Sequence, residues 1–165
     1  MAPRRELLLL RHGIAEDRAL GLEDAQRPLT PRGRERTAKV LERLVALGLA
    51  GDAMVSSPLV RAFQTAELAV AAGLADGFEP STALAPGGQP EPLLERLGQR
   101  LILVGHEPDL SELAAQLCGA PAGCLRLRKA GVILLELPQA EGEAFAGPGA
   151  RAILSLLLSP RSLGL

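Results

Sequence analysis

Aromatic side chains are almost absent from this chain of 165 residues, which has three Phe, no Tyr and no Trp. The core therefore has to be built from Leu, Val, Ile and Ala. The aromatic platforms on which single-stranded nucleic acids stack are missing as well. The net charge of −1 argues against a general polyanion-binding surface, so any anion site has to be local. We expect no nucleic-acid partner.

Long apolar runs are also lacking near the N-terminus. Leu7–Leu10 are four consecutive leucines, whereas a membrane-spanning helix needs about 20 apolar residues. The run continues into charged residues without the small-residue cleavage site of a signal peptide. We therefore expect a cytoplasmic protein without a membrane partner. The length fits one domain over residues 1–165, because domains commonly have roughly 100–200 residues.

Cysteine is scarce, and the two that are present, Cys118 and Cys124, form no Cys-x-x-Cys pair. No histidine lies close to either of them in the sequence. We expect buried or half-buried free thiols rather than a disulfide or a zinc site.

An apolar stretch that ends in Arg11, His12 and Gly13 is the most informative part of the chain. Four leucines fit a strand that is buried on both faces, as in a parallel sheet. In open α/β sheets, ligands bind outside the carboxyl ends of the strands. We interpret His12 as a nucleophile and Arg11 as part of a phosphate cradle. The alternative is that both are polar residues closing a strand.

The second half of the chain repeats this arrangement. Residues 101–104 form another apolar strand, and His106 follows its carboxyl end. The chain has two histidines, and both occupy this kind of position. A purely structural histidine remains the alternative at each position. We interpret Glu107 and Asp109 as solvated acids at the start of a helix.

Two threonine- or serine-proline signals predict helix starts. Thr30 and Pro31 begin one helix, and a second helix is expected from about Pro58 to Ala72. The second helix carries Arg61 near its N-terminus, where free amides and the helix dipole favour an anion. Pairing of Arg61 with a nearby carboxylate, Glu67 or Asp52, is the alternative.

The remaining segments complete an α/β pattern. A short strand is expected near Phe78–Ser81, and a brief helix over Pro92–Leu97. A further helix follows His106 and extends through Leu117. Apolar runs at 131–137 and 150–158 predict a closing hairpin, or a strand followed by a last strand or short helix.

If His12, His106, Arg11 and Arg61 meet above such a sheet, phosphoryl chemistry follows. Two guanidinium groups hold phosphate oxygens, and a neutral imidazole attacks phosphorus. A protonated second imidazole would bind an oxygen whose charge develops in the transition state. A metal site formed by His12, His106 and Asp109 lacks the spacing of strong zinc motifs, and the arginines oppose a cation. We expect neither a metal nor another cofactor.

Several segments together resemble the histidine phosphatase superfamily, also called phosphoglycerate mutase-like, and most closely its small SixA-type phosphohistidine phosphatases. The resemblance runs from about residue 7 to residue 117, and 157–163 also agrees. It rests on Leu9-Leu10-Arg11-His12-Gly13, Arg27-Pro28-Leu29-Thr30 with Gly33, Ser56-Ser57-Pro58-Leu59-Val60-Arg61-Ala62 with Gln64-Thr65-Ala66, and Val104-Gly105-His106-Glu107-Pro108.

The resemblance implies a three-layer α/β/α sandwich with a central, mostly parallel sheet. It implies that His12 is phosphorylated and that Arg11, Arg61 and His106 complete a phosphate pocket, with Gly13 and Ser57 also binding substrate. The implied activity removes phosphate from a phosphohistidine on a protein partner, either a phosphotransfer domain or a phosphocarrier. We expect the enzyme to be a monomer.

One departure bears on the substrate. Superfamily members that cleave phosphate esters usually place an acidic proton donor after the second arginine helix, whereas residues 84–89 here contain no carboxylate. An alkoxide needs protonation as it leaves, while an imidazole, whose conjugate acid has a pKa of about 6.5, needs far less help. A small-molecule phosphomonoesterase that uses Glu16, Asp17 or Asp109 as its acid stays open, as does a non-catalytic phosphate sensor.

Overall fold

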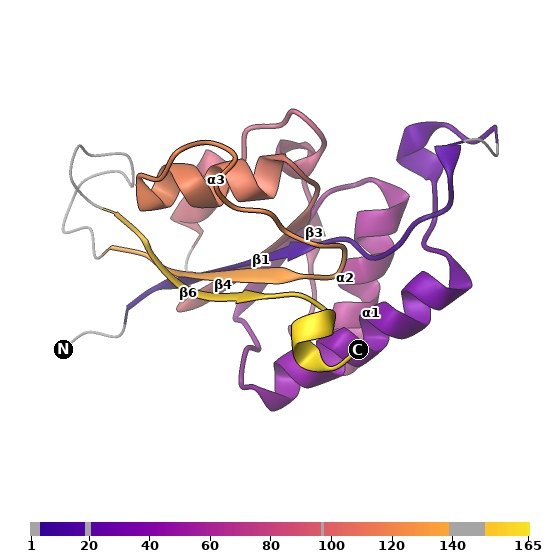
Figure 1. Cartoon of the computed structure of the whole chain (residues 1–165), viewed down its shortest axis with the longest axis horizontal. Helices are drawn as coiled ribbons and strands as arrows, with labels where there is room; N and C mark the ends of the chain where they lie inside the picture. The colour runs from indigo at the N-terminus through magenta and orange to yellow at the C-terminus, as the bar shows by residue number, and fades with distance from the viewer. Residues whose placement is uncertain (1–3, 19–20, 97, 139–150) are drawn as a thin grey trace.

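The computed structural model describes residues 4–18, 21–96, 98–138 and 151–165 (Figure 1). Its strands are β1 (Glu6–Arg11), β2 (Ala53–Ser56), β3 (Glu79–Pro80), β4 (Arg100–Gly105), β5 (Val132–Glu136) and β6 (Ile153–Leu158). The α-helices are α1 (Pro31–Ala46), α2 (Val60–Ala72) and α3 (Asp109–Cys118). The 3-10 helices are η2 (Asp24–Gln26), η3 (Thr82–Leu84), η4 (Glu91–Glu95) and η5 (Arg161–Leu163).

The strands form one six-stranded sheet in the order β3-β2-β4-β1-β5-β6. The first four strands in this order are parallel to one another. β5 runs antiparallel to β1, and β6 runs antiparallel to β5 and therefore in the same direction as β1. In the register, Arg11 lies beside Gly105, and Ser56 lies beside Val104. The carboxyl ends of β1, β4 and β2 therefore lie at the same edge of the sheet.

Helices cover both faces of this sheet, which confirms the expected three-layer sandwich. Figure 1 shows α3 on one side, with α1, α2 and the C-terminal turn on the other. The β1 leucines serve both layers because side chains alternate along a strand. Leu8 and Leu10 pack with α1 and α2, whereas Leu7 and Leu9 pack with α3. All four are fully buried, and full burial stabilises the fold by roughly 1.5–3 kcal/mol per side chain.

The predicted helix starts are largely correct. Thr30 caps α1 by accepting a hydrogen bond from Gly33 N at 2.8 Å, and Pro31 is the first helical residue. The second helix begins two residues later than expected, at Val60. Its cap is Leu59, which makes no side-chain capping bond, and Ser57 Oγ instead accepts from Leu59 N at 3.2 Å.

The other segments follow the expected order with shorter elements. The strand expected over Phe78–Ser81 has two residues, and the helix expected over Pro92–Leu97 is the 3-10 helix η4. The last two apolar runs form the closing hairpin, although part of the second run, residue 150, lies outside the described residues. No helix among the described residues is long and apolar enough to cross a membrane.

Gly33 provides a test of how the loop after β1 is held against α1. A Cβ atom at this position would lie 2.1 Å from the backbone oxygen of Ile14. We therefore expect Gly33→Ala to lower the unfolding free energy by about 1–3 kcal/mol, although alanine is the better helix former by about 1 kcal/mol. Chemical denaturation would measure this, with Gly77→Ala as the control because nothing lies within 4 Å of that position. A Gly33→Ala variant as stable as the parent would contradict the close approach.

Candidate active site

Three side chains leave the carboxyl edge of the sheet from adjacent strands. His12 follows β1, Ser57 follows β2 and His106 follows β4. Backbone bonds extend the strand pairing to these positions, from His12 N to Gly105 O at 3.1 Å and from Ser57 N to Val104 O at 2.9 Å. The structure thus brings the two histidines together, with ring centroids 5.1 Å apart and ring planes inclined by 54°.

The ring of His12 is held by one bond at each nitrogen. Its Nδ1 lies 2.7 Å from the backbone oxygen of Gly13, and its Nε2 lies 3.3 Å from Arg61 Nε. A carbonyl oxygen accepts hydrogen bonds and a guanidinium group donates them. The proton of the neutral ring therefore belongs on Nδ1, and the lone pair on Nε2. The nitrogen that carries the nucleophilic electron pair faces Arg61.

Burial keeps His12 uncharged. Burial, opposed by the bond to Gly13 and reinforced by the charges of His106, Arg61 and Arg11, lowers the pKa of His12 to about 3. The side chain is neutral at pH 7, which is the form that can attack an electrophile.

His106 is buried against Ser57. Its Nε2 lies 2.7 Å from Ser57 Oγ, and its Nδ1 has no hydrogen-bond partner among the described residues. In the tautomer in which Ser57 Oγ donates to Nε2, the ring proton lies on Nδ1, the nitrogen without a partner. Burial and the charge of Arg61 lower the pKa of His106 to about 4. The second imidazole is therefore also neutral at pH 7 without a ligand, and it offers a buried N–H.

Arg61 is fixed by a residue that the sequence interpretation did not single out, Asp24 in η2. Arg61 Nη1 donates to Asp24 O at 2.7 Å, and Nη2 donates to Asp24 Oδ2 at 3.1 Å. The alternative partners Glu67 and Asp52 were therefore wrong. Arg27 donates to the other carboxylate oxygen of Asp24 from two nitrogens, at 2.8 and 3.0 Å. The loop after β1 thus orients the arginine whose Nε contacts the nucleophile.

The sequence feature that could have pointed to Asp24 is its position three residues before the Arg27-Pro28-Leu29-Thr30 segment. Burial raises the pKa of Asp24, but hydrogen bonds and charges from Arg27 and Arg61 outweigh that effect and hold the pKa below its usual value. Asp24 is a carboxylate at neutral pH.

Arg11 lies at the end of β1, next to the histidine pair. Its Nη1 donates to Leu127 O at 2.8 Å, and its buried Nε has no partner among the described residues. Among the described residues, the two buried side-chain nitrogens without a partner belong to Arg11 and His106, which both lie at this edge. A buried nitrogen without a partner calls for an explanation, and an acceptor such as a phosphate oxygen would provide one.

Gly13 connects β1 to α2. Its N–H donates to Thr65 Oγ1 at 3.1 Å, and Thr65 Oγ1 donates to Arg61 O at 2.8 Å. A Cβ atom on Gly13 would lie 2.1 Å from Thr37 Oγ1, so only glycine fits here without a shift. The close approach keeps the Gly13 carbonyl beside the His12 ring.

The acids that were interpreted as solvated are partly engaged. The Glu107 carboxylate accepts hydrogen bonds from Ser111 and from Leu127 N, so it fixes the loop that also receives Arg11. Asp109 Oδ2 accepts from Gly87 N at 2.8 Å. Neither carboxylate contacts the histidine pair through a hydrogen bond among the described residues.

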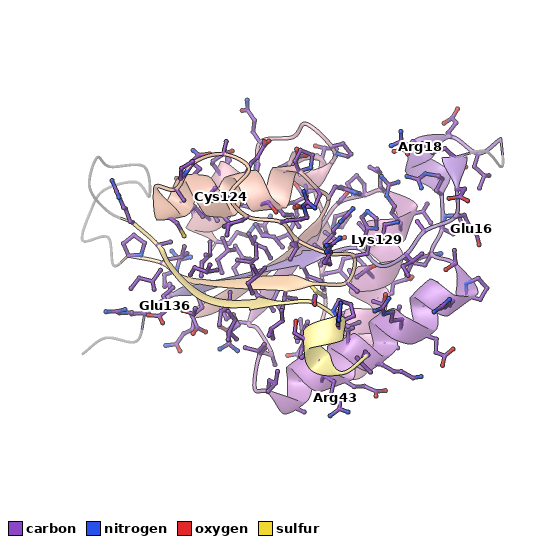
Figure 2. The ribbon with its side chains drawn as sticks, in the orientation of Figure 1. Glu16, Arg18, Arg43, Cys124, Lys129 and Glu136 are labelled. Atoms are coloured by element: carbon purple, nitrogen blue, oxygen red, sulfur yellow. The ribbon has the colours of Figure 1, made fainter. Side chains whose placement is uncertain are left out.

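Other expected groups lie away from the pair. Figure 2 shows Glu16 and Arg18 in the projecting loop after β1 and Cys124 near the end of α3. Glu16 is half-buried and Asp17 is exposed. Both cysteines are free, but Cys124 is exposed, contrary to the expectation of burial. Among the described residues, no three His, Cys, Asp or Glu side chains converge so that they could hold a metal ion.

Comparisons with known proteins agree with this arrangement. Residues 7–80 match the family model of the histidine phosphatase superfamily, branch 1. An uncharacterized protein of Picosynechococcus sp. (strain PCC 7002) is 42% identical over 166 residues, which cover 96% of this chain and 98% of that protein. The chain belongs to the histidine phosphatase superfamily.

Within the superfamily, its fold is SixA-like. The structure of the protein histidine phosphatase SixA complexed with tungstate has a TM-score of 0.79 at 21% identity, covering 96% of this chain and 99% of that one. A candidate SixA phosphohistidine phosphatase from Nakamurella multipartitia has a TM-score of 0.72 at 26% identity, covering 96% and 98%.

The lowered histidine pKa values predict a pH-dependent stability. An unfolded histidine gains a proton below a pKa of about 6.5, whereas the folded groups titrate at about 3 and about 4. The unfolded state binds more protons in this window, so the unfolding free energy should fall as the pH drops from about 6.5 to 5, by up to about 1.4 kcal/mol per pH unit for each histidine. Denaturation at a series of pH values measures this slope.

A His12→Gln/His106→Gln double variant is the control. Carboxylates with lowered pKa values titrate mainly below this window, so the double variant should lose most of the slope. An equally steep slope in the double variant would contradict the assignment of the effect to this pair.

Proposed function

We propose that this protein is a phosphohistidine phosphatase that acts on a protein partner through a covalent phosphohistidine at His12. The single observation that carries the proposal is the His12 ring, buried and neutral, with Nδ1 bonded to Gly13 O and Nε2 facing Arg61. The proposal includes one domain over residues 1–165 that acts as a monomer, in the cytoplasm, without a metal.

In the first step, the Nε2 lone pair of His12 attacks phosphorus as the bond from phosphorus to the substrate imidazole breaks. The leaving ring carries a proton on its other nitrogen, so it departs as a neutral imidazole. His12 keeps its Nδ1 proton, and its phosphorylated ring gains a positive charge that the Gly13 carbonyl stabilises. Charge and atoms balance without a proton from the enzyme.

In the second step, water attacks phosphorus and the bond to Nε2 breaks. The Nδ1 proton matters again because it allows His12 to leave as a neutral ring, and the proton lost by water stays with the phosphate. The same bond to Gly13 thus supports both the attack and the release.

The surrounding donors would hold the phosphoryl oxygens. Arg61 Nε, Arg11 Nε and the N–H of His106 are the candidates, and the latter two nitrogens have no partner among the described residues. Ser57 orients His106, and Gly13 orients His12. Removing one donor to a developing charge typically costs about 10²–10³ in rate. The tungstate held by the SixA structure is a tetrahedral oxyanion of the same shape.

The state of the acids favours a phosphorus–nitrogen bond as the one that is cleaved. Asp24, the carboxylate nearest to Arg61, is held ionised by two arginines and is a poor proton donor at neutral pH. Asp109 and Glu107 are engaged by backbone N–H groups. An ester substrate would require one of these groups, Glu16 or Asp17 to protonate the alkoxide, whereas a phosphohistidine would not.

A phosphoenzyme is the first expected outcome. Rapid acid-free quenching of the enzyme mixed with radiolabelled phosphohistidine protein should trap an acid-labile, alkali-stable phosphoryl group on His12. The His12→Ala variant should keep its fold by circular dichroism and form no adduct. Phosphate binding without any adduct in the parent would indicate a phosphate sensor instead.

A preference for phosphorus–nitrogen substrates is the second expected outcome. We expect turnover of phosphoramidate, which loses a nitrogen leaving group, to exceed that of an alkyl phosphate by at least about a hundredfold, because general-acid catalysis of ester cleavage typically supplies 10²–10⁴-fold. Steady-state phosphate release measures both rates. A preference for the alkyl ester would overturn the phosphohistidine assignment and favour a small-molecule phosphomonoesterase.

A further inference from the structure

A groove lined by basic residues lies beside the candidate active site. Its volume is about 440 Å³, and Arg11 is one of its lining residues. The other lining residues are Ile14, Arg36, Arg128, Lys129, Ser159, Pro160 and Arg161. Five of these eight side chains are cationic and none is acidic. The chain as a whole carries a net charge of −1, so this concentration of positive charge is local.

Separate parts of the fold supply these cations. Arg11 ends β1, Arg36 lies on α1, and Arg161 begins η5. Arg128 and Lys129 lie in the turn before β5, and Figure 2 shows Lys129 above η5 in this view, near the end of the sheet where β5 begins. Four segments that are distant in sequence therefore converge on one groove.

The turn with two of these cations is fixed to the strand that carries the nucleophile. Ala130 N donates to the backbone oxygens of Arg11 and His12, both at 3.1 Å, and Arg11 N donates to Gly131 O at 3.1 Å. Gly131 N closes the turn by donating to Arg128 O at 2.8 Å. Movement of Arg128 and Lys129 relative to His12 would break these bonds.

The five groove cations differ in their partners, since Arg36 donates to Leu165 O at 3.1 Å and Arg11 donates to Leu127 O at 2.8 Å. In residues 4–18, 21–96, 98–138 and 151–165, no carboxylate forms an ion pair with Arg128, Lys129 or Arg161. Burial lowers the pKa of Arg11, the charge of Glu107 opposes this effect, and the positive charge of Arg128 lowers the pKa further. Like charges held together cost free energy unless an anion binds between them.

We propose that this groove binds an acidic protein segment next to the phosphohistidine of the substrate. This inference rests on the proposed function and names the chemistry of its partner. Arg128, Lys129 and Arg161 are exposed rather than enclosed, which suits carboxylates presented on a protein surface more than a buried second phosphate of a small molecule. Arg11 lines the groove and lies next to His12, so a bound segment would place its phosphohistidine close to the nucleophile.

A variant in which two groove cations are replaced by glutamate tests the inference. The substrates are two phosphohistidine peptides, one with Asp and Glu flanking the phosphohistidine and one with Ser and Gly. The parent should show a kcat/KM at least about tenfold higher for the acidic peptide, because electrostatic steering typically raises association rates 10–10³-fold. Arg128→Glu/Lys129→Glu should abolish this preference by lowering kcat/KM for the acidic peptide far more than kcat/KM for the peptide with Ser and Gly. The preference of the parent should also decline as salt is added.

Arg34→Glu/Arg43→Glu is the matched control, because it changes the net charge equally and both residues are exposed and outside the groove. Figure 2 shows Arg43 at the far end of α1. This variant should keep the preference. The proposal would be overturned if the parent showed equal kcat/KM for both peptides. It would also be overturned if the two variants lost the preference for the acidic peptide equally.

A binding measurement keeps the two proposals distinguishable. Fluorescence anisotropy with a labelled, unphosphorylated acidic peptide should show binding to the parent and to the control variant, and at least about tenfold weaker binding to Arg128→Glu/Lys129→Glu. Binding without turnover of any phosphorus–nitrogen substrate would overturn the proposed function but support the groove. Turnover without binding would do the reverse. If the parent binds a small bisphosphate but does not bind the acidic peptide, the groove would be assigned to small molecules.

Discussion

The parallel pairing of β1 with β4 is the constraint on which the site depends. Their register places Arg11 beside Gly105, and the bond from His12 N to Gly105 O extends the pairing by one position beyond the sheet. A shift of one residue would move Glu6 or Arg11 into the place of a buried leucine, so the polar residues that bound the apolar run help to fix the register. The same leucines that stabilise the core therefore determine which side chains meet at the carboxyl edge.

Burial at this edge disfavours charged side chains. It keeps the two histidines neutral, and it requires the buried arginine to have a carboxylate partner. Two neutral imidazoles lie close to Arg11 and Arg61, and burial together with these cations disfavours a proton on either ring. Unpaired arginines would themselves be costly in such surroundings. Asp24 compensates Arg61 from the solvent side and leaves Nε directed at His12. The carboxylate thus positions a donor without removing the positive field from the nucleophile.

The sequence predicted what depends on local patterns. Apolar runs gave the buried strands, the Thr30-Pro31 pair gave the start of α1, and two histidines after two apolar strands gave the edge where they meet. Asp24 and Glu107 were not understood, because their partners are distant in sequence and are brought near by loops. Loop carboxylates look alike in a sequence, whether they are solvated or bound to backbone and arginine donors. The tautomer of His12 likewise depends on one carbonyl orientation that no spacing reveals.

A common fold does not determine a substrate, so the distinguishing features have to be sought in groups that the fold does not require. The histidine pair follows from the register of the sheet, whereas Arg128, Lys129 and Arg161 are exposed residues that neither the core nor the strand pairing needs. Holding them near one another in a chain of nearly zero net charge costs repulsion energy. A ligand that carries several negative charges would relieve this cost, and the phosphate at His12 would supply only some of them. The extra positive charge beside the site is therefore better explained by recognition than by the chemical step.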